Sequence, residues 1–304
     1  AQGNHMTTFR FSSPSRFFIA ALLLLGLCVA MPSALADAPR IVPSADGTPI
    51  SYEVSGTGEP TLVFVHGWSC DSRYFREQLP VFSKDHRVVA IDLAGHGHSG
   101  SSTRTEYTMK SFGEDVQAVL NDIGGGPFIL IGHSMGGIVI AEAARIDSSH
   151  LLGLILVDTV ESAEYKFSQE DFDKMAAPFL VDFPAACRAF VQTMLVPATP
   201  QSLREWIAAD MSSANPAVAM SAFRQMLSLY VQGAVATLFD EVPLPVVGVY
   251  ADLWPVDAEA NRRHMKSFEA IVLPGTDHFL QLGSPEKFND ALRQAIDLIP
   301  SKQP

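Results

Sequence analysis

The stretch ILIGHSMGGIVIAEAA, residues 129–144, determines how this chain is expected to fold. An apolar run leads to Ser134 and continues directly into small residues that suit a closely packed helix. A strand that turns at once into a helix strains the residue at the turn, and the turn closes only if nearby positions lack side chains. Gly132 and Gly136 meet that need. We therefore predict a sharp strand-to-helix turn that holds the Ser134 hydroxyl above the edge of a sheet.

Short apolar runs alternate with helical patterns on both sides of this turn. Most are apolar at every position, as expected of strands buried on both faces of a sheet. The predicted strands are residues 49–54, 61–65, 87–91, 127–131, 153–157, 245–250 and 270–274. One helix is indicated over 108–123 and another after Ser284 and Pro285, each with apolar side chains on one face. The alternation predicts the α/β fold class, with a mostly parallel sheet and helices on both faces.

Residues between Val160 and Val242 interrupt this alternation. Helical patterns fill the interval without a strand candidate of comparable strength. We predict an α/β core over 37–160 and 242–304, into which residues 161–241 are inserted as a helical cap. The cap supplies large apolar side chains, which we expect to form the roof of a pocket for acyl or aryl groups. The alternative is that these side chains only pack the cap against the core. These are Phe172, Met175, Phe179, Phe183, Phe190, Met194, Trp206, Met211, Phe223 and Met226.

Residues 1–36 have the features of an export signal. Residues 1–5 look like a cloning remnant, and two arginines then precede an apolar run over 17–31. That run is shorter than the roughly 20 residues that span a bilayer. Ala34 and Ala36 supply the small residues that a signal peptidase requires. We expect cleavage after Ala36 and a secreted or periplasmic protein without a stable membrane anchor, an uncleaved anchor helix being the alternative.

Composition limits the class of partner. The 304 residues are 47% hydrophobic and 18% charged and contain no repeats, which favours one large globular domain. Removal of residues 1–36 leaves 19 basic and 33 acidic side chains, a net charge of −14. Because phosphate backbones are bound by clustered Lys and Arg, we expect no nucleic-acid partner. Cys70 and Cys187 remain after cleavage, and the sequence leaves open whether they form a disulfide.

The stretch VFVHGWSCDS, residues 63–72, follows another predicted strand. A hydroxyl that attacks a carbonyl carbon produces an oxyanion, which two preorganised N–H groups stabilise. We predict that the backbone amides of Met135, directly after the serine, and of Trp68 form this oxyanion hole. His66 is expected to brace the loop rather than to take part in the chemistry.

His278 lies in a further loop, between the last predicted strand and the final helix. Because the carboxyl ends of parallel strands meet at one edge of the sheet, His278 is expected near Ser134. An imidazole within about 2.6 to 3.2 Å of a serine hydroxyl can accept its proton during attack. His278 is therefore the predicted general base.

A carboxylate that accepts a hydrogen bond from the Nδ1–H of His278 would hold the required tautomer. Asp252 lies just beyond the strand after the insertion and is the preferred candidate. Asp158 is the main alternative because it also follows a strand, and Asp257 is a further one. Asp277 adjoins the histidine and is not expected to reach the far ring nitrogen.

The glycine-rich stretch IDLAGHGHSG, residues 91–100, follows a further strand. His96 and His98 could belong to a metal or phosphate site, but the sequence lacks a third ligand nearby and the G-x-x-x-x-G-K-[ST] phosphate pattern. We expect a tight, hydrogen-bonded turn here. No metal or organic cofactor is expected for the chain.

Taken together, four features resemble the α/β-hydrolase superfamily. They are HGW at 66–68, D-x-x-G-x-G-x-S at 92–99, GHSMG at 132–136 and the chain order Ser134, Asp252, His278. The resemblance covers roughly residues 48–300 and implies the α/β-hydrolase fold with a catalytic triad and an oxyanion hole. Members of the family often have G-x-x-D at the acid, whereas this chain has Y-A-D at Asp252. The motifs specify the fold far more than the substrate.

These residues predict a serine hydrolase that cleaves carboxylic esters or lactones through an acyl-enzyme intermediate. Ser134 would attack, His278 would transfer the proton and Asp252 would orient the imidazole. Carbon–carbon bond hydrolysis, halide peroxidation and acyl transfer are alternatives within the same fold, and a ligand-binding module without turnover is an alternative outside enzymes. A dehalogenase or an epoxide hydrolase would need an aspartate in place of Ser134.

Overall fold

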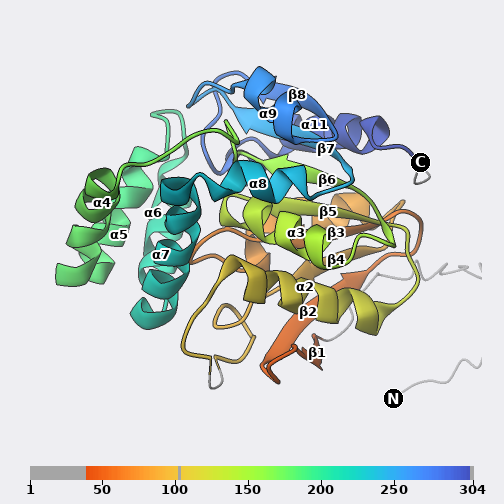
Figure 1. The fold of residues 1–304 in the computed structure, drawn as a ribbon, viewed down its shortest axis with the longest axis horizontal. Helices are drawn as coiled ribbons and strands as arrows, with labels where there is room; N and C mark the ends of the chain where they lie inside the picture. Colours follow the sequence, from red (N-terminus) through yellow and green to blue (C-terminus); the bar gives the residue numbers. More distant parts are fainter. Residues whose placement is uncertain (1–38, 102–103, 302–304) are drawn as a thin grey trace, which may run out of the picture. The chain divides into compact units, whose positions relative to one another are not determined.

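The computed structural model describes residues 39–101 and 104–301, so the predicted export signal over 1–36 lies outside the described residues. In the described part, eight strands form one sheet in the order β1-β2-β4-β3-β5-β6-β7-β8 (Figure 1). The strands are β1 (Arg40–Pro43), β2 (Pro49–Ser55), β3 (Thr61–Val65), β4 (Val88–Ile91), β5 (Phe128–His133), β6 (Leu151–Val157), β7 (Pro245–Ala251) and β8 (Ser267–Leu273). In this order, every neighbouring pair from β4-β3 to β7-β8 is parallel, and only the β1-β2 and β2-β4 pairs are antiparallel. The predicted mostly parallel sheet is confirmed.

The apolar runs of the sequence correspond to β2 through β8. β3, with the sequence TLVFV, and β6, with the sequence LLGLILV, are buried at every position, as strands covered on both faces must be. β1 was not predicted, because its four residues, RIVP, are mostly exposed and carry no apolar run. It forms an antiparallel edge of the sheet beside β2.

Helices cover both faces of the sheet, as predicted. The elements of the described chain are η1 (Ser72–Phe75), α1 (Leu79–Phe82), α2 (Met109–Ile123), α3 (Met135–Ile146), α4 (Gln169–Val181), α5 (Phe183–Thr193), α6 (Gln201–Ser212), α7 (Pro216–Gln232), α8 (Ala234–Asp240), α9 (Ala258–His264), α10 (Leu280–Gly283) and α11 (Pro285–Leu298). Buried side chains of α2 and α3 belong to one hydrophobic core, and those of α1 and α11 belong to a second. Within 39–101 and 104–301, no helix is both long and apolar enough to span a bilayer.

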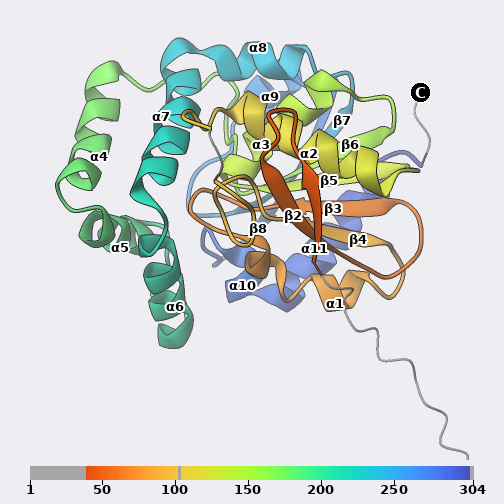
Figure 2. The same ribbon diagram turned by 90° about the horizontal axis from the view of Figure 1, so that it is seen from below.

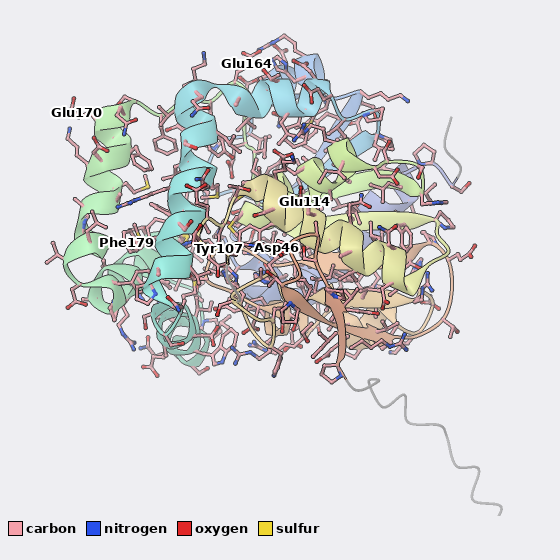
Figure 3. The ribbon with its side chains drawn as sticks, turned by 60° about the horizontal axis from the view of Figure 1, so that its bottom comes forward. Asp46, Tyr107, Glu114, Glu164, Glu170 and Phe179 are labelled. Atoms are coloured by element: carbon pink, nitrogen blue, oxygen red, sulfur yellow. The ribbon has the colours of Figure 1, made fainter. Side chains whose placement is uncertain are left out.

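The five helices α4 to α8 lie between β6 and β7, so the predicted insertion over 161–241 contains no strand of the sheet. Figure 2 shows α4, α5 and α6 at one side of the sheet, with α7 between α4 and the core. Phe179 of α4 points toward α7 (Figure 3), and its ring centroid lies 5.5 Å from that of Phe223 on α7.

Hydrogen bonds connect these cap helices to loops of the core. The Trp68 ring Nε1 donates to the Ala219 carbonyl at 2.7 Å. The backbone N–H of His278 donates to the Met194 carbonyl at 3.1 Å. The cap is therefore bonded to two of the loops in which the sequence predicts chemistry.

Cys70 and Cys187 are both buried and free, so the disulfide that the sequence left open is not formed in this structure. Burial raises the pKa of both thiols, that of Cys187 to about 12. A raised pKa keeps both groups as thiols, and the reactive form of cysteine is the thiolate. These side chains therefore act as small apolar groups in the packing.

Candidate active site

Ser134 occupies the turn between β5 and α3 with a backbone φ of +53°. A side chain at Gly132 would clash with the backbone carbonyl of Gly136, and one at Gly136 would clash with that of Val65. Both glycines are therefore required by close backbone contacts, as the sequence pattern predicts. The Ser134 N–H donates to the Val157 carbonyl at 3.0 Å, which fixes the turn against the end of β6.

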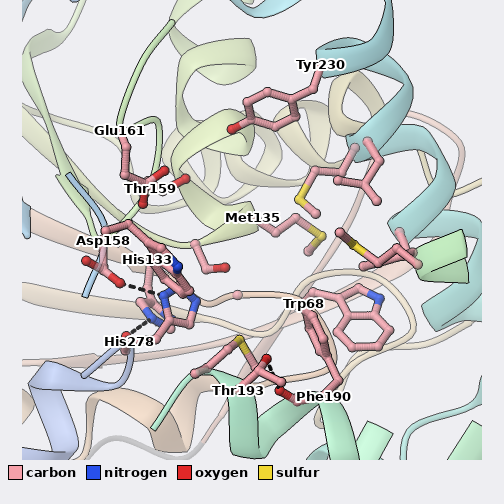
Figure 4. A pocket seen from close by; sticks show the side chains of 18 of the residues that line it. Trp68, His133, Met135, Asp158, Thr159, Glu161, Phe190, Thr193, Tyr230 and His278 are labelled. Carbon is pink, nitrogen blue, oxygen red and sulfur yellow. Dashed lines mark hydrogen bonds and ion pairs between the residues drawn. The ribbon is translucent and has the colours of Figure 1, made fainter. Parts of the chain in front are cut away.

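His278 lies in the loop between β8 and α10, at the same cavity as Ser134. The cavity has a volume of about 550 Å³, and both side chains belong to its lining (Figure 4). The imidazole is enclosed by rings, with centroids 4.8 Å from His133, 5.3 Å from Phe279 and 5.5 Å from Trp254. The structure thus brings together the two residues that the sequence places in separate loops.

The acid that contacts His278 is Asp158, and the prediction of Asp252 is wrong. The Nδ1 of His278 lies 2.6 Å from Oδ2 of Asp158, and both side chains are buried. The second carboxylate oxygen of Asp158 accepts the Ala251 N–H at 2.8 Å. Both oxygens of the buried carboxylate are thus used, one by the imidazole and one by the end of β7.

The order of the strands gives the physical reason. β6 is the direct neighbour of β5, so Asp158 leaves the sheet beside the turn that carries Ser134. The Asp158 N–H donates to Val249 of β7 at 2.9 Å, and a φ of +46° ends β6 abruptly at this residue. These contacts direct the carboxylate toward His278.

The other candidate acids serve the local backbone. Asp252 is exposed, and its Oδ1 accepts the Gly275 N–H at 2.9 Å. Asp257 caps α9, where its Oδ1 accepts the Ala260 N–H at 3.0 Å. Asp277 accepts the Phe279 N–H at 2.9 Å and a hydrogen bond from the Thr199 hydroxyl of the cap.

The loop after β3 lies against the serine turn. A Cβ at Gly67 would lie 3.1 Å from the Cβ of Ser134, so Trp68 leaves this loop directly beside the serine. The Cys70 N–H donates to the Gly67 carbonyl at 3.2 Å and closes the turn. Met135 is the first residue of α3, and its amide therefore has no carbonyl partner one turn earlier within that helix. The predicted oxyanion amides thus belong to two adjacent turns, and their role stays a prediction.

His66 braces this loop, as predicted. Its Nδ1 lies 2.8 Å from the Gly67 carbonyl, and its Nε2 accepts the Leu93 N–H at 3.1 Å. Burial lowers the pKa of His66, which keeps the imidazole neutral. One ring nitrogen therefore donates and the other accepts, and the ring joins the loops after β3 and β4.

The glycine-rich loop after β4 is a hydrogen-bonded turn, also as predicted. Asp92 accepts the Ser72 N–H and the His98 N–H, both at 2.8 Å. The Nδ1 of His96 lies 3.0 Å from the Ala94 carbonyl, and burial lowers the pKa of His96 to about 3. Within the described ranges, no group of three or more His, Cys, Asp or Glu side chains could hold a metal ion.

His133, the last residue of β5, is a site residue that the sequence analysis did not single out. Its Nε2 lies 2.8 Å from the backbone carbonyl of His278, and burial lowers its pKa well below the usual value. A neutral ring donates through Nε2 to that carbonyl and so fixes the loop of His278 to the end of β5. The signal was present in the motif, where the histidine directly precedes Ser134.

The cavity has an apolar side and a polar side (Figure 4). Six of the predicted roof residues line it, namely Met175, Phe190, Met194, Met211, Phe223 and Met226. Phe179 and Phe183 instead pack on Trp68, Trp206 packs on Tyr74, and Phe172 packs against the core. The polar side includes Thr159 and Glu161, which sequence analysis missed.

The family model described as the alpha/beta hydrolase family matches residues 62–291, and the chain belongs to this family. Among curated proteins, it is 24% identical over 264 residues to a pimeloyl-[acyl-carrier protein] methyl ester esterase of Aeromonas hydrophila, which covers 81% of this chain and 99% of the relative. Such esterase relatives support hydrolase activity.

Solved structures share the fold. An esterase from Exiguobacterium antarcticum superposes with a TM-score of 0.76 at 18% identity, covering 86% of this chain and all of that chain. A bromoperoxidase from Bacillus anthracis superposes with a TM-score of 0.74, also at 18% identity and with the same coverage. Because the two neighbours carry different activity names, the fold alone does not determine the reaction.

Proposed function

We propose that the chain hydrolyses carboxylic esters or lactones that carry an apolar acyl or aryl group. The observation that supports this most directly is the Asp158–His278 hydrogen bond beside Ser134 at an apolar cavity. Nucleophile, base and orienting acid are the three parts of a serine hydrolase triad. The esterase relatives agree with a small-molecule ester as substrate.

In the first step of the proposed mechanism, the Ser134 Oγ bonds to the carbonyl carbon and gives its proton to Nε2 of His278. Asp158 accepts the Nδ1–H, which leaves Nε2 free as the proton acceptor and stabilises the imidazolium. The oxyanion would be stabilised by the amides of Trp68 and Met135.

The tetrahedral intermediate then collapses. The carbon–oxygen bond of the leaving alcohol breaks, and that oxygen takes the proton from His278, leaving an acyl group on Ser134. In a lactone, the alcohol remains attached to the acyl group. In the second step, water gives a proton to His278 and attacks the acyl carbon, and the free acid leaves as Ser134 regains its proton.

The lining of the cavity supports an apolar acyl or aryl group. Methionine and phenylalanine side chains from four cap helices, α4 to α7, line the cavity, among them Met175, Phe190 and Phe223. Burying an apolar group against such a surface is favourable by about 25 cal/mol for each Å² removed from water. Flexible methionines also adapt to chains of different shape.

The test compares the wild type with Ser134→Ala on 4-nitrophenyl butyrate, together with labelling by a fluorophosphonate. We expect hydrolysis and a covalent adduct on Ser134 in the wild type only. Equal hydrolysis by both proteins, or an adduct on another residue, would overturn the proposal. A monochlorodimedone halogenation assay with hydrogen peroxide and bromide separates hydrolysis from peroxidation.

We also propose that the protein acts outside the cytoplasm. The basic residues, the apolar run and the alanines of residues 1–36 support export. Fractionation of cells that express the full chain, with N-terminal sequencing of the exported form, tests this. Retention of residues 1–36 on a cytoplasmic protein would contradict it.

A further inference from the structure

Glu161 is a carboxylate at the cavity to which the proposed ester hydrolysis gives no role. It lies three residues after Asp158 and lines the same cavity as Ser134. The Asp257 N–H donates to its backbone carbonyl at 2.8 Å and so fixes this segment. Figure 4 shows its carboxylate next to Thr159, across the cavity from Trp68.

The surroundings of this carboxylate do not neutralise its charge. Burial, and then the negative charge of Asp158, raise the pKa of Glu161, while a hydrogen bond from its own backbone N–H and the nearby His278 side chain oppose the rise. Among the described residues, no lysine or arginine forms an ion pair with the Glu161 carboxylate, whereas the nearby Glu164 is paired with Arg263. A partly buried carboxylate without a basic partner is costly, and a ligand with a positive charge would remove that cost.

Aromatic rings line the cavity near the same carboxylate. Tyr165, Phe167 and Tyr230 all belong to the lining, and their ring centroids lie 5.0 to 6.4 Å from one another. The hydroxyl of Tyr230 points toward Glu161 and Thr159 (Figure 4). Aromatic faces attract ammonium groups, and the attraction strengthens where water is excluded.

We propose that Glu161 and these three rings bind an ammonium group of the substrate, so that the preferred substrates are esters of amino alcohols. The inference rests on the proposed function, because it names the substrate class of the same site. The negative net charge of the chain, −12, favours the approach of cations. The apolar side of the cavity would then hold the acyl group, with Ser134 between the two.

Binding to Ser134→Ala tests the subsite without turnover. Butyrylcholine and 3,3-dimethylbutyl butyrate have the same shape and differ in one positive charge. We expect Ser134→Ala to bind butyrylcholine about tenfold more tightly than the uncharged ester by titration calorimetry. We expect Glu161→Gln in the same background to bring the ratio of the two affinities close to one. An unchanged ratio, or a ratio of one in Ser134→Ala itself, would overturn the inference.

Glu164→Gln is the matched control. Glu164 lies only three residues away, but it is exposed and paired with Arg263 outside the cavity, and we expect this variant to keep the affinity ratio. Should Glu161→Gln fail to fold, Tyr165→Leu changes a half-exposed ring of the subsite, 52% accessible, and is expected to lower the ratio about threefold. An unchanged ratio in folded Tyr165→Leu would then overturn the inference.

Failure of the proposed function gives a different result. If the wild type and Ser134→Ala hydrolyse esters equally, the serine mechanism is wrong, whatever the affinity ratio is. If hydrolysis depends on Ser134 while Glu161→Gln leaves the affinity ratio unchanged, only the ammonium subsite is wrong.

Discussion

The end of β6 and the end of β7 are alike in sequence and different in structure. Both strands are buried apolar runs, and each is followed directly by an aspartate. Asp158 is buried and divides its oxygens between His278 and the Ala251 amide, whereas Asp252 is exposed and accepts the Gly275 amide. The place of a strand within the sheet therefore decides which acid reaches the histidine.

The largest expected effect separates the two aspartates directly. Asp158→Asn is expected to lower kcat about 10⁴-fold, because the imidazole loses the acceptor that sets its tautomer. Asp252→Asn is expected to change kcat less than about threefold, because its side chain is exposed and lies outside the site. Steady-state hydrolysis of 4-nitrophenyl butyrate measures both. A comparable loss in the two variants would show that the contrast between the strand ends is not functional.

A smaller loss is expected at His133, which holds the loop of His278 from the end of β5. His133→Asn removes the hydrogen bond to the His278 carbonyl, and kcat should fall about 10- to 100-fold while KM changes less. The pH profile of kcat should also shift, because the imidazole of His278 is no longer held in place. A loss confined to the amount of folded protein would mean that His133 has only a packing role.

Three buried histidines near the site predict that acid lowers the stability of the folded protein. Burial lowers the pKa of His66, His96 and His133, so these rings stay neutral when folded. The unfolded chain binds protons below about pH 6.5, so the free energy of unfolding falls as the pH drops. For His96, whose folded pKa is about 3, the loss is about 2 kcal/mol between pH 7 and pH 5. Urea unfolding at pH 7 and pH 5 measures this loss.

A variant isolates one of these rings. His96→Gln should lose about 2 kcal/mol less than the wild type between the two pH values, since it has one fewer buried imidazole. His150→Gln changes an exposed histidine and serves as the control. Equal losses in His96→Gln and the wild type would contradict the buried neutral state of His96.

The smallest expected effect concerns Asp252 as a structural residue. Asp252→Ala removes the acceptor of the Gly275 N–H and should cost about 1 kcal/mol, or roughly 2 to 4 °C in Tm. Differential scanning calorimetry measures it, with Asp182→Ala, at the N-cap of α5 in the cap, as a comparison of similar size. An unchanged Tm for Asp252→Ala would mean that this hydrogen bond does not stabilise the loop.

Local geometry explains which parts of the site could be predicted. The turn at Ser134 is dictated by residues within two positions of it, and the loop of His278 follows from the chain order of strand and helix. The choice of acid depends on strand neighbours that no local pattern encodes. The departure from G-x-x-D weakened the assignment of Asp252, but Asp158 in GLILVD also lacks this pattern, so the sequence motif could not choose between the two.

The cap shows the same limit. The absence of strand patterns predicted the insertion, but not which apolar side chains face the cavity. Phe190 and Trp206 have the same character in the sequence, yet Phe190 lines the cavity and Trp206 packs on Tyr74. Glu161 was missed because a single carboxylate in a loop carries no pattern until its neighbours in space are known.

The hydrogen bond from the His278 amide to Met194 has a consequence for protein engineering and for divergence of the family. Consider a chimera in which residues 161–241 are exchanged for the insertion of another family member. The exchange replaces the segment that carries the Met194 carbonyl, which holds the loop of the proposed general base, together with the roof of the pocket. A new roof must therefore place a backbone carbonyl where Met194 has one, or the loop that follows β8 needs compensating changes.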